Sequence, residues 1–588
     1  MNQIDERQSE RPIAALPIRF KGLAGHFMSA EPGAQASDTA VLLVSPWGFE
    51  DMSLRKFYRE IAEELAILGI ANLRFDLPGT GDSSDPADAG TLDSWVLSVN
   101  TASDQLQAMT GASKVILLGH GIGGTLATMA VNRLPAVTGL ALLAPVVSGR
   151  AYLRETALWW KLIAGDLGLG AEATDSSKVT IAGFEMPDQI AAEIRKIKEA
   201  ALTLERPLQI LCVSRPGRDD DCSFAQAQKQ SGSEIECFDY TGYDTLVTNP
   251  MISRVPTGLA AKVAAWARAK SPVEAPARAA MPVSDVTMST NTYVESGIRF
   301  GSQGHLVGTL CEPVGERKGS PLLIVGTSYD RAAGWGRMGV QMARALAETG
   351  VTSLRFDAAG VADSPSLPGD PRQVLYSASH DRDVRQALHE LAFRTGSRAL
   401  VGGRCSGGYH AFKASIDNDE CAGVVLINSY AFVWEEGANV DDVLLQIARP
   451  LSDYSKRATD IETFRRIMRG EVNLTRAAFN ITSQIASRFA ERLAPVFGGL
   501  VGKNRLASDI HNAFRKLEEQ GKPVLLLYGD HDPGLQQFHL AFGPDGKALK
   551  KFSNADYQSL GEADHNITEK QVQQRVIADI ARMATRAA

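Results

Sequence analysis

The sequence of 588 residues has little of what several classes of protein require. No apolar run approaches the roughly 18 to 20 residues that span a bilayer, and the polar, mixed-charge N-terminus has no secretory signal. We therefore expect a cytoplasmic protein with no membrane span. The chain has six cysteines: Cys212, Cys222, Cys237, Cys311, Cys405 and Cys421. Their spacing fits neither a metal site nor a disulfide-stabilised scaffold.

A strong excess of one charge is also missing. The chain has 61 Lys and Arg against 68 Asp and Glu, a formal charge of −7, and no clustered basic stripe. Nucleic-acid binding needs such a stripe to neutralise phosphates. We therefore exclude nucleic acid as a partner, and the sequence leaves the oligomeric state open.

What the chain does contain is a repeat. The run Leu73-Arg-Phe-Asp-Leu-Pro-Gly-Thr-Gly-Asp-Ser83 recurs 281 positions later as Leu354-Arg-Phe-Asp-Ala-Ala-Gly-Val-Ala-Asp-Ser364. Further on, Gly119 matches Gly403 at an offset of 284. A nearly constant offset between distant landmarks indicates a tandem duplication.

The copies are separated by residues 268–288, which are rich in alanine and proline and are typical of a semi-extended linker. We predict a first domain over residues 1–267 and a second over 289–588. In each, short apolar strands such as Val41–Val44 alternate with helical stretches such as Leu54–Leu68. This pattern predicts an α/β fold, with two mostly parallel sheets covered by helices on both faces.

Each copy has a glycine-rich corner after a buried strand. The first, Gly119-His-Gly-Ile-Gly-Gly124, formally fits a dinucleotide fingerprint, but it lies deep in the domain and the next strand ends without an acid, which argues against a nucleotide cofactor. The second, Gly403-Arg-Cys-Ser-Gly407, fits a nucleophile elbow with Cys405 on the sharp turn. The N–H of Ser406 and the helix N-terminus would stabilise an oxyanion and lower the thiol pKa. The alternative is that Cys405 is an ordinary buried thiol.

A nucleophile needs a base, and the base needs an orienting acid; in this fold the acid comes first along the chain. The strand at Pro523 runs into an acidic turn, where Asp532 lies deeper than Asp530 and is the better candidate acid. His565, before the last amphipathic helix, is the candidate base. Alone, Asp532 and His565 would be a turn former and a surface histidine. Their order after a cysteine elbow favours a triad.

With these motifs, the chain resembles two α/β-hydrolase domains in tandem. The second, with Cys405, Asp532 and His565, is similar to dienelactone-hydrolase-like enzymes, which use a cysteine nucleophile. The Leu-Arg-Phe-Asp run and residues Arg337–Ala347 are also similar to hydrolases associated with exosortase and exopolysaccharide loci. The resemblance implies a hydrolase that acts on a small-molecule or acyl substrate, a saccharide-linked one included.

The first copy lacks the same residues. Gly121 stands where Cys405 stands, and Thr245 stands over His565, so we predict a degenerate, non-catalytic domain. We interpret the acidic run 219–221 as a solvated stretch rather than a metal site. The second copy has roughly thirty more residues between the strand after its elbow and its acid strand. They predict a helical cap over the elbow at about 430–520.

These residues predict acyl transfer to Cys405, with His565 as base and Asp532 as orienting acid. Cys405 would attack an ester, thioester or lactone carbonyl, and the oxyanion would be held by the N–H groups of Ser406 and of Thr327, in the loop after Val325. Water would then release the acid, without metal or cofactor. The alternatives are an acyltransferase with the same cysteine, a scaffold or binding protein with both copies inactive, and a peptidase, to which a thiol is less suited.

Overall fold

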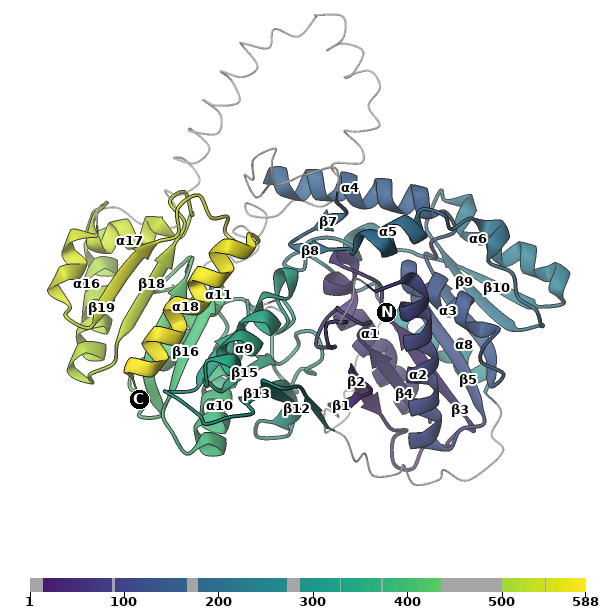
Figure 1. The fold of residues 1–588 in the computed structure, drawn as a ribbon, viewed down its shortest axis with the longest axis horizontal. Helices are drawn as coiled ribbons and strands as arrows, with labels where there is room; N and C mark the ends of the chain where they lie inside the picture. Colours follow the sequence, from purple (N-terminus) through teal and green to yellow (C-terminus); the bar gives the residue numbers. More distant parts are fainter. Residues whose placement is uncertain are drawn as a thin grey trace, which may run out of the picture.

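The protein contains two sheets, one from each copy of the repeat, that lie side by side (Figure 1). In Figure 1 the first copy runs from purple to blue and the second from teal to yellow. The computed structural model describes residues 14–86, 90–166, 178–271, 286–327, 329–371, 374–434, 500–544 and 546–587.

The first copy is built from one eight-stranded sheet, a small hairpin and the helices around them. Its strands are β1 (Leu16–Phe20), β2 (Leu23–Met28), β3 (Thr39–Val44), β4 (Asn72–Phe75), β5 (Lys114–His120), β6 (Val137–Leu143), β7 (Thr180–Ile181), β8 (Phe184–Glu185), β9 (Gln209–Ser214) and β10 (Glu234–Asp239). Its helices are α1 (Phe49–Ile67), α2 (Leu92–Thr110), α3 (Ile122–Val131), α4 (Gly149–Asp166), α5 (Asp188–Ile194), η2 (Glu199–Ala201), α6 (Asp219–Ala227), η3 (Gln228–Ser231), α7 (Tyr243–Leu246) and α8 (Leu259–Ala269).

The second copy is built from a nine-stranded sheet and its helices. Its strands are β11 (Thr287–Ser289), β12 (Tyr293–Phe300), β13 (Leu306–Pro313), β14 (Leu322–Val325), β15 (Ser353–Asp357), β16 (Ala399–Arg404), β17 (Cys421–Ile427), β18 (Val524–Tyr528) and β19 (Ala555–Ser559). Its helices are η4 (Trp335–Arg337), α9 (Met338–Glu348), α10 (Ala378–Thr395), α11 (Ser406–Ser415), α16 (Leu500–Glu519), α17 (Leu535–Phe542), η5 (Lys547–Lys551) and α18 (Lys570–Arg586).

The two sheets have the same strand order. The first runs β1-β2-β4-β3-β5-β6-β9-β10, and the second, after the additional edge strand β11, runs β12-β13-β15-β14-β16-β17-β18-β19. In each, the strands from β3 or β14 onward pair in parallel, while β2 and β13 pair antiparallel with both neighbours. The predicted α/β fold with largely parallel sheets is confirmed in both copies.

The sheet of each copy is buried on both faces. Along β3, Leu42 and Val44 pack in one core cluster with α2 and α3, whereas Val41 and Leu43 pack in another with α1 and α8. Neighbouring residues on a strand point to opposite faces, so an unbroken apolar run serves both layers. In the second copy, α10, α11, α16 and α17 cover one face, and α9 and α18 cover the other.

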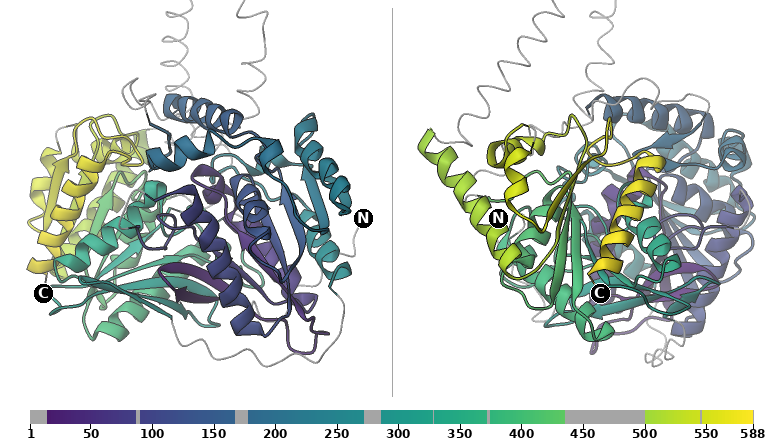
Figure 2. Two further views of the ribbon diagram at one scale, coloured as in Figure 1. Left: turned by 45° about the vertical axis from the view of Figure 1, so that its right-hand side comes forward. Right: turned by 60° about the vertical axis from the view of Figure 1, so that its left-hand side comes forward.

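Buried ion pairs join the copies. Arg74 of the repeated Leu-Arg-Phe-Asp run binds Asp363 of the second copy at 2.8 Å, and Arg355, its counterpart, binds Asp82 of the first copy at 2.9 Å. The exchange is reciprocal, as across a two-fold axis between identical subunits. Strands β1 and β12 lie against each other at the same junction (Figure 2).

Some expectations concern parts of the chain that the structure does not describe. Most of the linker, residues 272–285, and most of the cap, residues 435–499, lie outside the described residues. The domain limits 1–267 and 289–588 stay predictions. The final helix is present as α18, and none of the described helices is long and apolar enough to cross a membrane.

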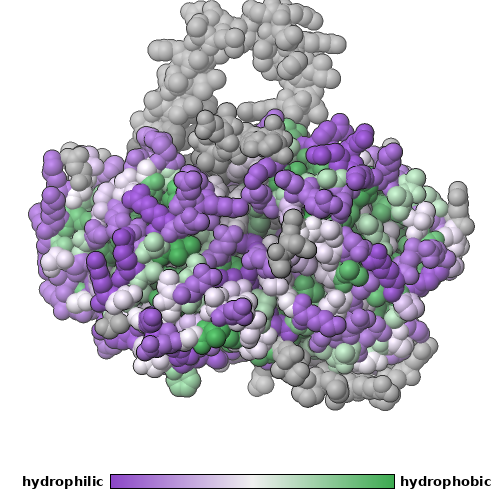
Figure 3. All heavy atoms as spheres, in the orientation of Figure 1, coloured by the Kyte–Doolittle hydropathy of each residue, from purple (hydrophilic) through white to green (hydrophobic). Residues whose placement is uncertain are grey.

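The outer surface carries few large apolar side chains. The face in Figure 3 is mostly hydrophilic, with hydrophobic residues in small separate groups. Over the described residues, the exposed large hydrophobic side chains are far apart in the sequence: Ile67, Leu97, Leu158, Val314 and Phe393. What holds the copies together is therefore found in the buried junction.

The reciprocal pairs predict a large stability cost when one partner is removed. Asp363 accepts hydrogen bonds from both Arg55 and Arg74, and all three side chains are buried. Asp363→Asn leaves the buried Arg74 guanidinium without its counter-charge and removes one of the carboxylates bound to Arg55, which keeps Asp76 at 2.8 Å. We therefore expect a loss of about 3–5 kcal/mol in the free energy of unfolding. Urea denaturation measures it. Asp417→Asn, which removes an exposed pair with Lys516, should leave the midpoint unchanged, and equal effects of the two variants would refute this.

Candidate active site

Cys405 lies on a sharp turn between β16 and α11. Its φ of 55° and ψ of −124° place it in a backbone region that non-glycine residues rarely occupy, and such strain is typical of functional turns. The backbone at Gly407 lies close to the end of β14 and the loop after it. A Cβ on Gly407 would lie 2.6 Å from the carbonyl oxygens of Val325 and Gly326. Glycine at 407 therefore lets the start of α11 approach the loop after β14. The structure thus forms the predicted elbow.

His565 and Asp532 lie beside the elbow. His565 Nδ1 donates to Asp532 Oδ2 at 2.7 Å, and Asp532 Oδ1 accepts from the Gly534 N–H at 2.7 Å. The Asp532 side chain is fully buried. The other ring nitrogen of His565 is left to hydrogen-bond the Cys405 thiol. The structure therefore brings the three predicted residues together in the order cysteine, histidine, aspartate.

The alternative acid, Asp530, points elsewhere. It accepts a hydrogen bond from the hydroxyl of Ser559 at the end of β19 and lies exposed. The two candidates lie on either side of His531, and the sequence analysis preferred Asp532 because it lies deeper in the loop. Of the two, Asp532 contacts the histidine.

The electrostatics of the site favour a thiolate. Burial alone would raise the pKa of Cys405, but the charge and hydrogen bond of His565, with Arg404 and the Ser406 N–H, lower it overall. Burial opposes the charge on His565 as well, yet Cys405 and Asp532 raise its pKa to about 10. A thiolate beside an imidazolium is the state in which a cysteine is most nucleophilic at neutral pH.

The loop after β14 faces the elbow. We call residues 326–332 the oxyanion loop because they contain Thr327, the predicted oxyanion donor; Ser328 lies outside the described residues. Thr327 Oγ1 donates to Asp330 Oδ2 at 2.5 Å, and the guanidinium of Arg404 binds the same oxygen at 3.2 Å. Arg404 also donates to Asn566 Oδ1 at 2.5 Å and to the His565 carbonyl at 3.3 Å.

Arg404, Asp330 and Asn566 were missed by the sequence reasoning. Two of them lie next to a predicted residue: Arg404 precedes Cys405, and Asn566 follows His565; Asp330 lies three positions after Thr327. Their hydrogen bonds tie the oxyanion loop, the elbow and the histidine loop together. The only available signal was this adjacency, because a charged residue beside a buried nucleophile needs a partner.

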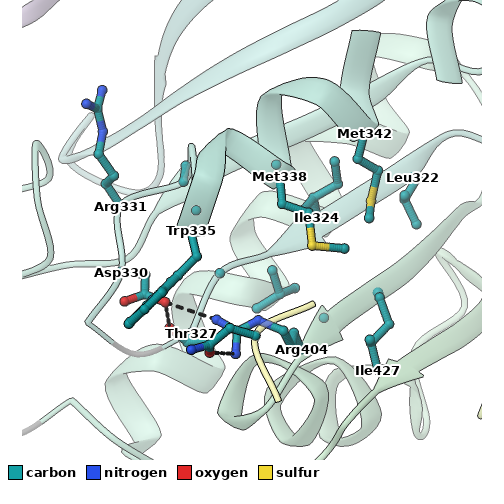
Figure 4. Close-up of a pocket in the computed structure, with 18 of the residues that line it drawn as sticks. Leu322, Ile324, Thr327, Asp330, Arg331, Trp335, Met338, Met342, Arg404 and Ile427 are labelled. Atoms are coloured by element: carbon teal, nitrogen blue, oxygen red, sulfur yellow. Dashed lines mark hydrogen bonds and ion pairs between the residues drawn. The ribbon is translucent and has the colours of Figure 1, made fainter. Parts of the chain in front are cut away.

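A small cavity opens behind the oxyanion loop, on the α9 side of the sheet (Figure 4). Its volume is about 60 Å³, and Arg404 and Asp330 lie at one end. The cavity does not include Cys405. Its other walls are mostly apolar: Leu322, Ile324, Trp335, Met338, Met342, Ile427 and Ile580.

An aromatic cluster lies on the Cys405 side. Tyr376 stacks on Trp434 with ring centroids 4.3 Å apart and meets Tyr409 edge-on at 4.9 Å. Burial raises the pKa of Tyr376 and of Tyr430, and the charge of Cys405 adds to both shifts, so these phenols are near the sulfur. The cluster also includes two residues of the first copy, Met251 and Ile252.

The first copy keeps the elbow without its nucleophile. Gly121 has φ 54° and ψ −126°, the conformation of Cys405. A Cβ there would lie 2.7 Å from Glu50 Oε2, so the Glu50 carboxyl fills the nucleophile's place. Thr245 lies six residues after the last residue of β10, as His565 does after β19, but it is exposed and donates to the Gly242 carbonyl.

Burial favours the uncharged forms of Glu50 and His120, the titratable groups beside Gly121. Burial raises the pKa of Glu50 to about 8, while Arg215 opposes the rise. Burial also lowers the pKa of His120, whose Nδ1 lies 3.7 Å from Glu50 Oε1, to about 3. The two groups beside Gly121 thus favour their uncharged forms, unlike the thiolate and imidazolium that the second copy favours.

The acidic run 219–221 differs from the prediction. Asp221, expected to be solvated, is buried and binds the Arg215 guanidinium through both oxygens, at 2.7 and 2.9 Å. The reason is local. The start of α6 lies against the end of β9, where Asp221 accepts hydrogen bonds from the backbone and the guanidinium of Arg215. Across the described residues, no three His, Cys, Asp or Glu side chains are grouped closely enough to hold a metal ion.

Two family models match the chain. Residues 38–191 match the model described as serine aminopeptidase, S33, and residues 319–569 match the model of the alpha/beta hydrolase fold. The matches begin 281 positions apart, which is the offset of the repeated run. The chain therefore contains two α/β-hydrolase regions in tandem, as the repeat predicted.

Solved structures also resemble parts of the chain. Est1E from Butyrivibrio proteoclasticus with bound ferulic acid is 16% identical over 38% of this chain and 89% of its own, with a TM-score of 0.29. An α/β serine hydrolase without a lid from Xanthomonas campestris is 14% identical over 45% and 96%, at 0.29. Carboxyl esterase 2 from Tuber melanosporum is 14% identical over 52% and 89%, at 0.30. A search of curated proteins finds no match.

The pairing with His565 predicts selective alkylation of Cys405. Iodoacetamide reacts with the thiolate, so Cys405 should be modified at pH 6 to 7, well below the roughly 8.5 of an ordinary thiol. Cys237 is the control: it is exposed, but burial and Cys222 raise its pKa. Site-resolved mass spectrometry gives both rates. We expect Cys405 to react faster despite its burial, and faster reaction at Cys237 would contradict a stabilised thiolate.

The buried carboxyl of Glu50 predicts a pH-dependent stability. Its folded pKa of about 8 lies above the unfolded value of 4.5, so its contribution is full below pH 4.5 and is lost as the pH rises toward 8, by up to roughly 1.4 kcal/mol per pH unit. Glu50→Gln should remove this slope. Urea midpoints between pH 5 and 9 test it, and parallel curves for wild type and variant would disprove it.

Proposed function

We propose that the chain is a hydrolase of esters, thioesters or lactones, with Cys405 of the second copy as its nucleophile. The observation that carries the proposal is the contact series from the strained elbow at Cys405 to His565 and on to the buried Asp532. Cysteine nucleophiles suit thioesters and activated esters, because a thiolate attacks their carbonyl carbons readily and their leaving groups need little protonation.

The proposed reaction has two halves. The Cys405 thiolate attacks the carbonyl carbon, and the resulting oxyanion accepts hydrogen bonds from the N–H groups of Ser406 and Thr327. The C–O or C–S bond then breaks, and the His565 imidazolium protonates the leaving alcohol or thiol. Water attacks the thioester next, giving its proton to His565, and the acid leaves as the thiolate re-forms.

The surroundings of Cys405 support an uncharged, apolar acyl group. Tyr376, Tyr409, Tyr430 and Trp434 lie on that side. Aromatic rings of this kind offer a large apolar surface against which an uncharged acyl or aromatic group can pack. The ammonium of Lys413 lies 3.4 Å from the Tyr409 hydroxyl and is already paired with Asp381. The guanidinium of Arg404, the residue before Cys405, is likewise already bound, to Asp330 and Asn566.

The first copy is, in this proposal, non-catalytic. Gly121 offers no nucleophile, Glu50 fills the space in front of it, and Thr245 points away into solvent. The serine aminopeptidase family that residues 38–191 resemble is named for a serine, and this copy has none at the elbow.

A panel of aryl esters, alkyl thioesters and lactones tests the proposal. Cys405→Ala should lower kcat/KM by at least about 10³-fold on every substrate that the wild type turns over, while the exposed control Cys237→Ala should retain full activity. Adding alcohol and sugar acceptors separates hydrolysis from acyl transfer by the product formed. Full activity in Cys405→Ala would overturn the proposal, and the absence of any turnover would favour the scaffold alternative.

A further inference from the structure

Arg331 extends from the oxyanion loop into the first copy. Its Nη1 donates to Asp51 Oδ2 at 2.7 Å, and its Nη2 donates to Asp76 Oδ2 at 2.9 Å. The side chain is 5% exposed, and a further bond of 3.2 Å joins Nη1 to Asp76 Oδ1. A buried guanidinium that donates to two carboxylates at hydrogen-bond distance is held in one orientation.

The neighbours of Arg331 hold the other side of the loop. Asp330, the preceding residue, binds Thr327 and Arg404. The N–H of Ala332, the next residue, donates to Asp357 Oδ1 at 2.6 Å. Three consecutive residues of the oxyanion loop are therefore fixed by contacts. Of these, Asp330 and Ala332 bind residues of the second copy, and Arg331 binds residues of the first.

The segment after the loop docks on the first copy as well. Trp335 packs in the first copy's core, with its ring 6.2 Å from that of Phe49. Arg337 donates to the carbonyls of Gly81 and Ser83 at 2.9 and 2.8 Å. The path from the oxyanion loop into α9 thus lies on a surface made by the first copy.

The repeat shows that this arrangement is particular to the second copy. Glu50 and Arg331 are equivalent, because each lies six residues after the last residue of the matching strands, Val44 and Val325. Glu50 turns inward to its own elbow, beside Gly121. At this one position the copy with a cysteine has an arginine that crosses the junction, whereas the other copy has a glutamate that stays beside its own elbow.

We infer that the first copy positions the oxyanion loop of the second through the contacts of Asp76 and Asp51 with Arg331. This inference rests on the proposed function, since it assigns the loop an oxyanion to hold. Donors must lie within about half an ångström of their place to stabilise a transition state. Asp76 and Arg331 are positioning residues: they touch neither substrate nor Cys405.

A matched pair of variants in the first copy tests it. Asp76→Asn weakens the hold on Arg331, and Asp82→Asn removes another buried carboxylate of the same turn, which binds Arg355. With an ester that the wild type hydrolyses, Asp76→Asn should lower kcat at least tenfold with KM within about threefold, because a misplaced oxyanion donor costs up to 10²–10³-fold in kcat. Asp82→Asn should stay within about twofold.

Alkylation separates positioning from general damage. Iodoacetamide attack on Cys405 forms no oxyanion, so its rate in Asp76→Asn should equal that of the wild type. Arg331→Lys, which keeps the charge but loses the two-pronged contact, should lie between Asp76→Asn and wild type in kcat, and serves if Asp76→Asn does not fold. Unchanged kcat in the folded variants, or alkylation that falls in step with kcat, would overturn the inference. Activity that survives Cys405→Ala would instead overturn the proposed function.

Discussion

The copies meet through buried arginine–carboxylate pairs, and the rest of the structure depends on that contact. Arg74 with Asp363, Arg355 with Asp82 and Arg331 with Asp76 all cross the junction. A buried charge is tolerated only while its partner is in place. The carboxylate in the turn after the Leu-Arg-Phe-Asp run of each copy is therefore paired with an arginine of the other copy. The reciprocal pattern is that of a symmetric dimer whose subunits have become one chain.

The elbows of the two copies have the same backbone conformation but different side chains around it. Gly121 and Cys405 share φ and ψ within a few degrees, so the turn persists after the nucleophile is gone. The difference lies in the side chains that reach the turn: a protonated Glu50 in one copy, and an imidazolium held by Asp532 in the other. Glu50 and Arg331 occupy equivalent positions, and the first lies against its own elbow while the second binds carboxylates of the other copy.

Much of this could be predicted from the sequence. The repeat and the strand pattern predicted two α/β units, and the fixed order of nucleophile, acid and base along this fold placed Cys405, Asp532 and His565 near one another. Contacts across the junction could not be predicted: Arg331 and Asp76 are 255 positions apart, and nothing local distinguishes their pairing from that of any other charged residues. The burial of Asp221 was missed for a different reason: its partner Arg215 is close in the sequence, but the contact forms only when α6 places Asp221 against the end of β9.

The central claim is that two hydrolase folds make one active site. Active-site titration measures this most directly: the purified chain is mixed with excess of an activated aryl ester under conditions where deacylation is slow, and the burst of released alcohol is compared with the protein concentration. The account predicts one equivalent per chain, with the acyl group on Cys405 in the digested protein. Two equivalents, or an acyl group on a residue of the first copy, would contradict it.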